Sequence, residues 1–461
     1  MMLLDYLNLN ESSEEPLYQQ LYRFFCDAIS NGQIAAGEHL PSIRRLAEDL
    51  NVSRTTVETA YQQLCVEGYM ESRPQRGYYA LQLTMAPQKS VLAHTRQAAP
   101  PVPKLRYRFS TDSIDRRAFR VELWQKYIRE VLSHQEIITA YGNHQGEPEL
   151  RTALTEYSHS VRGVTSSPER IVVGAGTQPL LFMLSGMLRR NDRMIGMESP
   201  GFAQAEQVFG DCGLEICRLP GDESGIRLDA LQESGVRIIY VNPTNRLGSG
   251  SPIPMTRRAE LIDWANRRGA LIIEDDYNGE LRYSARPIPA MQSIGNGENV
   301  VYLGTFSKVL LPSVRMGYMV LPPSLAAIYH ERSAAYNQTA SRIEQLALAR
   351  MIQEGELEKQ LRRLRKLYSA KGSLLVSCLQ KEFGSKIQIT MQETALRIVL
   401  CPGAAISAAQ LCSLAAQENV LVIPFDEKDG LGRVMLGFSG IAQEEIPEAV
   451  HHLRLAWEKQ I

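Results

Sequence analysis

The sequence has no marked excess of charge of either sign, since its 461 residues include 50 Lys and Arg against 51 Asp and Glu. Any binding of nucleic acid or of an anionic membrane must therefore come from a local group of residues. The seven cysteines form no Cys-x-x-Cys pair. This absence argues against a disulfide framework and against a structural zinc site, and it is typical of a protein from the reducing cytoplasm. We expect no metal site.

Long uninterrupted apolar runs are also absent. Two uncharged segments, residues 171–188 and 398–417, reach the ~18–20 residues that a membrane-spanning helix needs. Both contain Gly, Pro, Ser and Gln, which is typical of a strand that turns into a helix. The first ten residues lack the basic start and the small-residue cleavage site of a secretory signal. We therefore expect a soluble, cytoplasmic protein without membrane contact.

The length of the chain exceeds the ~250–300 residues at which a single hydrophobic core stops growing. The clearest boundary is the segment 84–105, which holds four prolines among Ala, Gln and Ser and no acidic residue. This composition is typical of a semi-extended linker. We expect one domain at residues 1–83 and a second at residues 106–461, the latter with a large lobe at about 120–335 and a small C-terminal lobe at about 341–461.

The first domain shows a helical pattern followed by a hairpin pattern. Apolar residues recur every three to four positions in residues 16–30, a short helix is expected after Pro41, and Ser53 is a favourable N-cap for a third helix. Residues 69–72 and 77–81 then predict two strands. Three helices and a β-hairpin indicate a mainly α, winged helix-turn-helix domain.

A recognition helix needs hydrogen-bonding and cationic side chains at its amino end to reach bases and phosphates. The third helix meets this need, and arginines in the second helix and in the hairpin are placed to contact the DNA backbone. The predicted contacts with double-stranded DNA are Arg44, Ser53, Arg54, Thr55, Thr56, Arg76 and Gly77. Residues 1–83 nevertheless carry six Arg, no Lys and eleven Asp or Glu, a net charge of −5, which predicts weak non-specific DNA binding. A protein contact is the alternative use of such a domain.

After the linker, short apolar runs alternate with helical stretches. The runs at 171–173, 194–197, 238–241, 271–273 and 300–303 predict buried strands of a mainly parallel sheet with helical crossovers. Residues 341–382 predict one long amphipathic helix. Strands are expected near 387–389, 396–400, 421–423 and 434–438, with a closing helix. The pattern indicates an α/β large lobe and a smaller α+β lobe.

Polar motifs follow three of these strands, at the edge of the sheet where α/β proteins bind ligands. Residues 174–179, G-A-G-T-Q-P, open a helix and indicate either a phosphate site or a plain turn. Asp275 and Lys308 each follow a predicted strand. A lysine beside Arg315 and out of bulk water would have a lowered pKa, as an imine-forming lysine requires. The acid could pair with a pyridinium nitrogen, and a phosphate could be held by Thr305, Ser307 and Arg315.

Residues 304–318, G-T-F-S-K-V-L-L-P-S-V-R-M-G-Y, resemble the pyridoxal-phosphate lysine region of fold-type-I aminotransferases. Residues 37–47, G-E-H-L-P-S-I-R-R-L-A, and the S-R-T-T-V that follows at 53–57 are similar to a GntR-type winged helix. In this order, and with this linker, nearly the whole chain resembles the MocR/GabR transcriptional regulators. The resemblance implies a homodimer that binds an operator on double-stranded DNA, together with the cofactor pyridoxal 5'-phosphate.

The resemblance also implies roles for individual residues. Lys308 would form the Schiff base with the cofactor, Asp275 would pair with its pyridine nitrogen, and Tyr277 would donate to its ring hydroxyl. Asp276 would point the opposite way on an extended strand, as a solvated or helix-capping carboxylate. The further cofactor contacts are Thr305, Ser307, Arg315, Gly176, Thr177 and Gln178 at the phosphate, Phe202 on the ring, and Tyr141 from a neighbouring subunit, with ordinary packing as the equal alternative for Phe202 and Tyr141.

Two motifs depart from the aminotransferase pattern. Where the family has N-P-T-G, this chain has N-P-T-N-R-L-G-S-G, so the contact to the ring hydroxyl comes from Asn242 or Asn245, or is replaced by Leu247. Met435 stands at the position of the family's substrate-carboxylate arginine. Arg433, two residues earlier on the same strand face, is the candidate contact for an effector, with a surface position as the alternative.

These residues leave three functions open. The first is a regulator that senses an amino compound, or pyridoxal phosphate itself, through an aminotransferase-like domain. The second is a working aminotransferase with an accessory DNA-binding head. The third is a regulator whose large domain has lost the cofactor and only mediates dimerisation, which the intact set of Asp275, Lys308 and Arg315 argues against. We expect the first, because the two altered motifs weaken a catalytic function.

Overall fold

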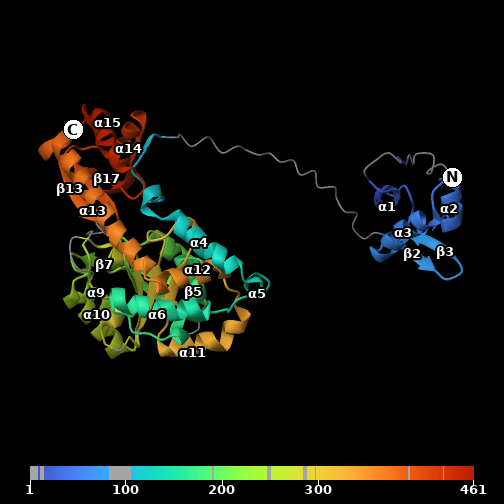
Figure 1. Cartoon of the computed structure of the whole chain (residues 1–461), viewed down its shortest axis with the longest axis horizontal. Helices are drawn as coiled ribbons and strands as arrows, with labels where there is room; N and C mark the ends of the chain where they lie inside the picture. Colours follow the sequence, from blue (N-terminus) through green and yellow to red (C-terminus); the bar gives the residue numbers. More distant parts are fainter. Residues whose placement is uncertain are drawn as a thin grey trace. The chain divides into compact units, whose positions relative to one another are not determined.

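The computed structural model describes residues 9–10, 15–82, 105–188, 192–246, 251–283, 288–295, 297–392, 395–428 and 430–461. These residues belong to two compact units, Met1–Val102 and Pro103–Ile461 (Figure 1). The segment expected as a linker, residues 84–105, lies outside the described residues except for Leu105.

The first unit packs three helices against a small antiparallel sheet. Its elements are α1 (Leu17–Ser30), β1 (His39–Leu40), α2 (Ile43–Asp49), α3 (Arg54–Val66), β2 (Met70–Arg73) and β3 (Gly77–Ala80), and the strands pair in the order β1-β3-β2. Tyr61 of α3 joins the parts of this core. Its ring lies 5.5 Å from that of Phe25 and 4.9 Å from that of Tyr78, and its hydroxyl donates to the Pro41 carbonyl at 3.0 Å. The predicted winged helix-turn-helix fold is confirmed.

The second unit is built on an eight-stranded sheet in the order β5-β12-β11-β10-β9-β6-β7-β8. The strands are β5 (Ile171–Gly174), β6 (Met194–Ser199), β7 (Glu215–Asp222), β8 (Gly225–Ile226), β9 (Ile238–Val241), β10 (Leu271–Asp276), β11 (Val300–Thr305) and β12 (Gly317–Val320). Strand β12 runs antiparallel to β11 and β5, β8 runs antiparallel to β7, and the other pairs are parallel. The mainly parallel sheet is confirmed, whereas β7, β8 and β12 were not predicted.

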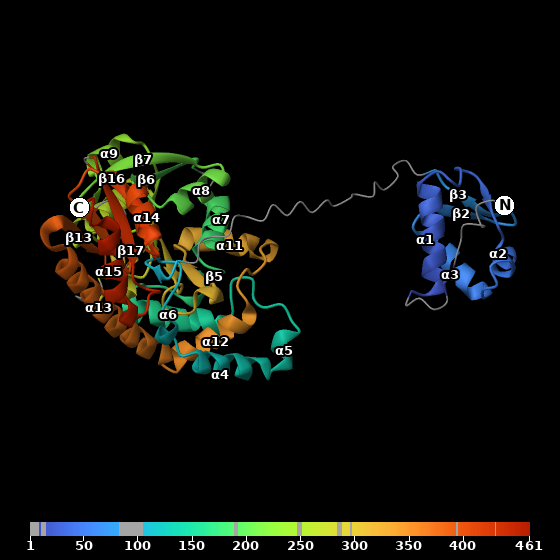
Figure 2. The same ribbon diagram turned by 90° about the horizontal axis from the view of Figure 1, so that it is seen from above.

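Helices cover both faces of this sheet, so alternate residues of a strand enter different apolar clusters. Ile171 and Val173 of β5 belong to one cluster, and Val172 to the other. Figure 2 shows α6 and α12 on one side of the sheet and α7 and α8 on the other. The helices of this lobe are α4 (Val121–Leu132), α5 (Gln135–Ile138), α6 (Pro148–Arg162), α7 (Thr177–Leu188), α8 (Ala203–Asp211), α9 (Leu228–Glu233), α10 (Met255–Arg268) and α11 (Pro323–Arg332).

The small lobe is an antiparallel sheet covered by helices. Its strands β13 (Ile387–Gln392), β14 (Arg397–Pro402), β16 (Ile423–Lys428) and β17 (Leu431–Gly437) pair in the order β13-β14-β17-β16. Helix α14 (Ala408–Gln417) lies between β14 and β16 in the chain, and α15 (Ile446–Trp457) follows β17. A separate two-stranded ladder joins β15 (Val420–Leu421) in parallel to β4 (Tyr107–Arg108).

The single long helix predicted for residues 341–382 is wrong. Two helices occupy this stretch, α12 (Arg342–Gln353) and α13 (Glu356–Phe383). They are separated at Gly355, whose φ of 70° is left-handed and ends the first helix. Helix α13 is 28 residues long but rich in charge, and no described helix is both long and apolar enough to cross a membrane.

Candidate functional site

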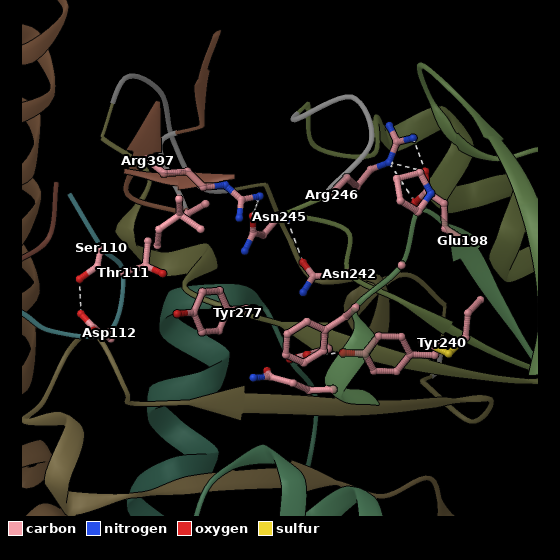
Figure 3. Close-up of a pocket in the computed structure, with 18 of the residues that line it drawn as sticks. Ser110, Thr111, Asp112, Glu198, Tyr240, Asn242, Asn245, Arg246, Tyr277 and Arg397 are labelled. Atoms are coloured by element: carbon pink, nitrogen blue, oxygen red, sulfur yellow. Dashed lines mark hydrogen bonds and ion pairs between the residues drawn. The ribbon is translucent and has the colours of Figure 1, made fainter. Parts of the chain in front are cut away.

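A cavity of about 500 Å³ opens beyond the C-terminal ends of β6, β9 and β10 (Figure 3). The large lobe, the small lobe and the segment that follows β4 all contribute to its wall. The lining residues are Ser110, Thr111, Asp112, Met197, Glu198, Pro200, Gly201, Phe202, Gln204, Tyr240, Asn242, Asn245, Arg246, Asp275, Tyr277, Ala395, Arg397, Leu421 and Ile423. This is the edge of the sheet at which the sequence places its polar motifs.

Asp275, near the end of β10, is a buried carboxylate of this cavity. The Tyr240 hydroxyl donates a hydrogen bond to its Oδ2 atom. Burial raises the pKa of Asp275 to about 6, although the Tyr240 hydrogen bond acts in the opposite direction. The cavity therefore holds a carboxyl group whose negative charge is poorly stabilised until a cationic group comes close.

Asp276, the next residue, does not line the cavity. Its carboxylate forms a buried ion pair with Arg162 and accepts hydrogen bonds from the hydroxyls of Tyr302 at 2.9 Å and Thr244 at 3.2 Å. The expectation that Asp276 is solvated or caps a helix is therefore wrong. It holds α6 to the sheet, and Asp275 is the one of the two that faces the cavity.

Lys308 lies in the turn after β11 and is only 4% exposed. Its ammonium group donates to the carbonyl oxygen of Thr111, a residue of the cavity wall. Burial lowers the pKa of Lys308 to about 8, against a smaller opposing effect of Asp112. The sequence suggested Arg315 as a cause of this shift, but burial is the dominant one. The structure thus places an amine of lowered pKa beside the cavity.

Glycines bring three strands close together next to Lys308. The register aligns Thr305 of β11 with Gly317 of β12 and Gly317 with Gly174 of β5. Gly176 has a φ of 92°, and a Cβ atom there would lie 3.2 Å from the Arg315 guanidinium. The hydroxyls of Thr305 and Ser307 are 2.9 Å apart.

The same place lies at the start of α7, whose first-turn N–H groups have no partners within the helix. Thr177 and Gln178 belong to this turn. Strand pairing therefore brings two hydroxyls, a guanidinium and a helix N-terminus near one another, and such groups are suited to hold a phosphate. None of these residues belongs to the lining of the cavity itself.

Several expected ring contacts do line the cavity. Asn242 accepts a hydrogen bond from the Asn245 backbone N–H at 2.9 Å, and the side-chain oxygen of Asn245 accepts from Arg397 at 3.3 Å. Tyr277 stands between the two lobes in Figure 3. Phe202 lines the cavity and also packs against the apolar cluster of α7 and α8, and its contact with the cofactor ring stays a prediction. Leu247 lies outside the described residues.

Two expected site residues lie elsewhere. The guanidinium of Arg433 forms an ion pair with Asp426 on the neighbouring strand β16 and does not line the cavity. Tyr141 is fully exposed between α5 and α6, also away from the cavity.

Four features of the cavity were missed at the level of sequence. They are Tyr240, the Glu198–Arg246 ion pair, the segment 110–112 and Arg397. Arg397 left a signal, because it is a charged residue within the apolar run A-L-R-I-V-L that forms β14. The others could not be found without the fold, since their partners are 35 to 197 residues away in the chain.

In the first unit, the amino end of α3 has the cap that the sequence predicts. The Ser53 hydroxyl accepts a hydrogen bond from the Thr56 backbone N–H at 3.1 Å and lies 2.8 Å from the Thr56 hydroxyl. These two side chains therefore stabilise the helix start. Arg54 and Thr55 are exposed next to them.

Ion pairs divide the six arginines of residues 15–82 into two groups. Acidic partners bind four of them, namely Arg23, Arg44, Arg45 and Arg73. Among the described residues, Arg54 and Arg76 have no acidic partner. Arg76 is held at the hairpin turn by its backbone carbonyl, which accepts from His39 at 2.9 Å, and a Cβ atom on Gly77 would lie 2.7 Å from the same histidine. Among the described residues, one arginine on α3 and one on the hairpin are thus without an ion-pair partner.

Comparisons with known proteins account for both units. Residues 115–453 match the family model of class I and II aminotransferases, and residues 17–79 match that of bacterial regulatory proteins of the gntR family. The uncharacterized HTH-type transcriptional regulator YdeL of Bacillus subtilis (strain 168) is 35% identical over 98% of both chains. The probable rhizopine catabolism regulatory protein MocR of Rhizobium meliloti is 31% identical over 98% of this chain and 96% of its own.

Solved structures resemble the second unit. A multiple substrate aminotransferase from Thermococcus profundus superposes with a TM-score of 0.68 at 24% identity, over 78% of this chain and 92% of its own. The expected aminotransferase fold is confirmed by this likeness.

Proposed function

Since the chain belongs to the MocR-type transcriptional regulators, in which a GntR-type winged helix is joined to an aminotransferase domain, we propose that it binds pyridoxal phosphate at Lys308 and that an amino compound bound there changes its affinity for DNA. Its relatives over the whole length are regulators, so the chain is a DNA-binding regulator rather than an aminotransferase with an accessory head.

The residues of the second unit fit this cofactor. Asp275 offers a buried carboxylate to a ring N–H, and its raised pKa indicates that a cationic partner would stabilise it. The space beside Gly176 is free of a Cβ atom and is bordered by Arg315 and by the start of α7, as a phosphate requires. When bound, the cofactor supplies an aldehyde with which primary amines condense.

The observation that carries the proposal is the environment of Lys308. The amine is buried, its pKa is lowered to about 8, and its only hydrogen bond among the described residues goes to a backbone carbonyl. A lysine in this state reaches the nucleophilic neutral form close to physiological pH, which an exposed lysine does not.

Binding of an effector would then be read out by the first unit. An amino compound that competes with Lys308 would shift the equilibrium between states of the second unit, and the linked winged helices would respond if these states differ in DNA affinity. The proposal includes a homodimer, supported by the fully exposed Tyr141 and by the exposed Phe182 on α7. Two heads would compensate for the net charge of −5 at residues 1–83 by binding two half-sites.

The test combines an absorption spectrum with DNA binding. Purified full-length chain is titrated with pyridoxal phosphate, and a visible band that differs from free cofactor is expected for the wild type. Lys308→Ala should lose this band while its melting temperature stays within a few degrees. A panel of amino compounds should change the DNA affinity of the wild type but not of Lys308→Ala. An unchanged visible band in the variant would refute the assignment of Lys308.

A further inference from the structure

Arg397 is a buried cation without a counter-charge. It begins β14 directly after Leu396, whose left-handed φ of 53° is unusual for a branched residue, and it is 8% exposed. Its guanidinium lines the cavity and extends toward Asn245 (Figure 3). Among the described residues, which exclude Glu393 and Thr394, no carboxylate lies within ion-pair distance of it.

The hydrogen bonds of Arg397 leave part of its guanidinium unused. Nε donates to the side-chain oxygen of Gln392, and Nη2 donates to that of Asn245 at 3.3 Å. Both acceptors are neutral amides, which orient the group without neutralising it. A guanidinium has five N–H donors, so the Nη1 pair and one donor of Nη2 remain without a partner among the described residues. Phe425 lies 5.6 Å from the guanidinium and supports its plane.

Other buried arginines of the same unit show what a structural role looks like. Arg162 pairs with Asp276, and Arg246 in the same cavity pairs with Glu198 and also donates to two backbone carbonyls at 2.6 Å. Arg258 donates to three backbone carbonyls at 2.7 to 3.1 Å. A buried charge needs such compensation. Among the described residues Arg397 has no such compensation, so its charge is available to an anion that enters the cavity.

We propose that Arg397 binds the carboxylate of the effector, and that the effector is therefore a small amino acid rather than a simple amine. The free edge of the guanidinium matches a carboxylate with two parallel hydrogen bonds. This inference rests on the proposed function in one respect, since the amino group of the same ligand reacts at the cofactor held by Lys308.

The alternatives for this role are occupied by other interactions. Arg433, the candidate from the sequence, lies 5.3 Å from the ring of the same Phe425 but is bound to Asp426. Arg315 does not line the cavity, and it lies beside Gly176, where an added Cβ atom would stand 3.2 Å from its guanidinium. The cavity volume of about 500 Å³, shared between cofactor and ligand, limits the amino acid to a small one.

The first experiment compares L-alanine with L-alaninamide, which differ in the carboxylate alone, on the full-length chain loaded with pyridoxal phosphate. Affinity is read from the shift of the visible band. Wild type should prefer L-alanine at least tenfold, and Arg397→Met should weaken L-alanine about 10- to 100-fold while changing L-alaninamide less than threefold. Arg433→Met, on the same aromatic ring, is the matched control and should change neither. No preference in the wild type, or equal losses in both variants, would overturn the proposal.

Two further measurements keep the result interpretable. Arg397→Lys retains the positive charge but not the two parallel N–H donors of the guanidinium, and it should bind L-alanine about tenfold more weakly. This variant tests the role of Arg397 even if Arg397→Met does not fold. Propionate binding to the cofactor-free chain, followed by saturation-transfer NMR, should depend on Arg397 and not on Arg433. If the wild type forms no visible band, the proposal that the chain binds pyridoxal phosphate at Lys308 is refuted. The role of Arg397 is then decided by the propionate measurement.

Discussion

Among single residues, Asp275 links the stability of the protein to its cofactor. Its pKa is raised from 3.8 to about 6 by burial, so the folded chain holds this proton more tightly than the unfolded chain. The folded state therefore loses stability as the pH rises from about 4 to 6, and the full loss persists above that window. A neutral side chain of the same shape removes this loss but also removes the proposed partner of the cofactor's ring nitrogen.

We therefore predict that Asp275→Asn stabilises the cofactor-free chain by about 1–3 kcal/mol at pH 7.5 and weakens pyridoxal phosphate at least about tenfold. Urea unfolding gives the first quantity and fluorescence titration the second. The stability difference should shrink at pH 4.5, where the aspartic acid keeps its proton in the folded chain. A variant that binds the cofactor as well as wild type would contradict the assignment of Asp275.

The lowered pKa of Lys308 predicts the pH dependence of cofactor loading. The reactive neutral amine increases about tenfold for each pH unit up to about pH 8 and is then saturated, whereas an ordinary lysine would continue to pH 10.4 or so. The rate at which the visible band appears after mixing with pyridoxal phosphate, measured from pH 6.5 to 9.5, should follow this curve. Lys308→Arg, which keeps the charge but cannot condense, is the control and should give no band.

At the level of elements, the amino end of α3 separates stability from DNA recognition. Ser53 caps the helix, whereas the exposed Arg54 has no partner among the described residues. Ser53→Ala should cost about 1 kcal/mol of stability in the first unit. Arg54→Ala should leave the stability unchanged, cost about 1–3 kcal/mol of affinity for a DNA fragment that the wild type binds, and reduce the salt slope by about one. Equal DNA affinity of Arg54→Ala and wild type would remove α3 from the interface.

The strands that the sequence predicts well are those with continuous apolar runs. The observed bounds of strand β9, Ile238–Val241, equal the predicted ones. Its four consecutive apolar residues are all buried, as is typical of a strand covered on both faces of a parallel sheet. Strand β12, Gly317–Val320, was missed because its first two residues end the motif at 304–318, and its antiparallel direction is set by β11 and β5, not by its own residues. The helix break at Gly355 was readable, since glycine within a helical pattern is a common end signal.

The residues of the candidate site also fall into two groups, those that local motifs predict and those that only the packing of the folded chain brings to the cavity. Lys308, Asp275 and Arg315 come from short motifs at strand ends, so local sequence and family likeness could identify them. The segment 110–112 could not be identified, because it reaches the cavity only through the pairing of β4. Arg397 could be singled out as a charged residue within an apolar run, but its place in the cavity wall depends on the packing of the small lobe. Arg433 was chosen from the position of the family's arginine and from strand spacing, neither of which shows that Asp426 lies opposite it.

At the level of the whole molecule, the two compact units predict separable functions. Residues 105–461 alone should form the same visible band, with cofactor affinity within about twofold of the full chain, because the cavity and Lys308 lie within this unit. Residues 1–83 alone should bind the wild-type DNA fragment about 100-fold more weakly than the full chain, since they lose the second head. Fluorescence anisotropy checks the second expectation. Loss of the visible band in the larger fragment would show that the units are not independent.

The course of the chain between residues 105 and 112 has a mechanical consequence. Strand β4 is held by hydrogen bonds from Tyr107 to Asn419 at 3.0 Å and from Phe109 to Leu421 at 2.9 Å, and Thr111, which accepts from Lys308, comes two residues later. A pull on the chain at residue 105 therefore loads this short ladder first and the lysine contact next. Linked equilibria are reciprocal, so if loss of the Lys308–Thr111 contact loosens this ladder, a pull at residue 105 must favour release of Lys308 to the same extent. The anchor of residue 105 and the contact of the amine thus lie within a few residues of one another on the same segment.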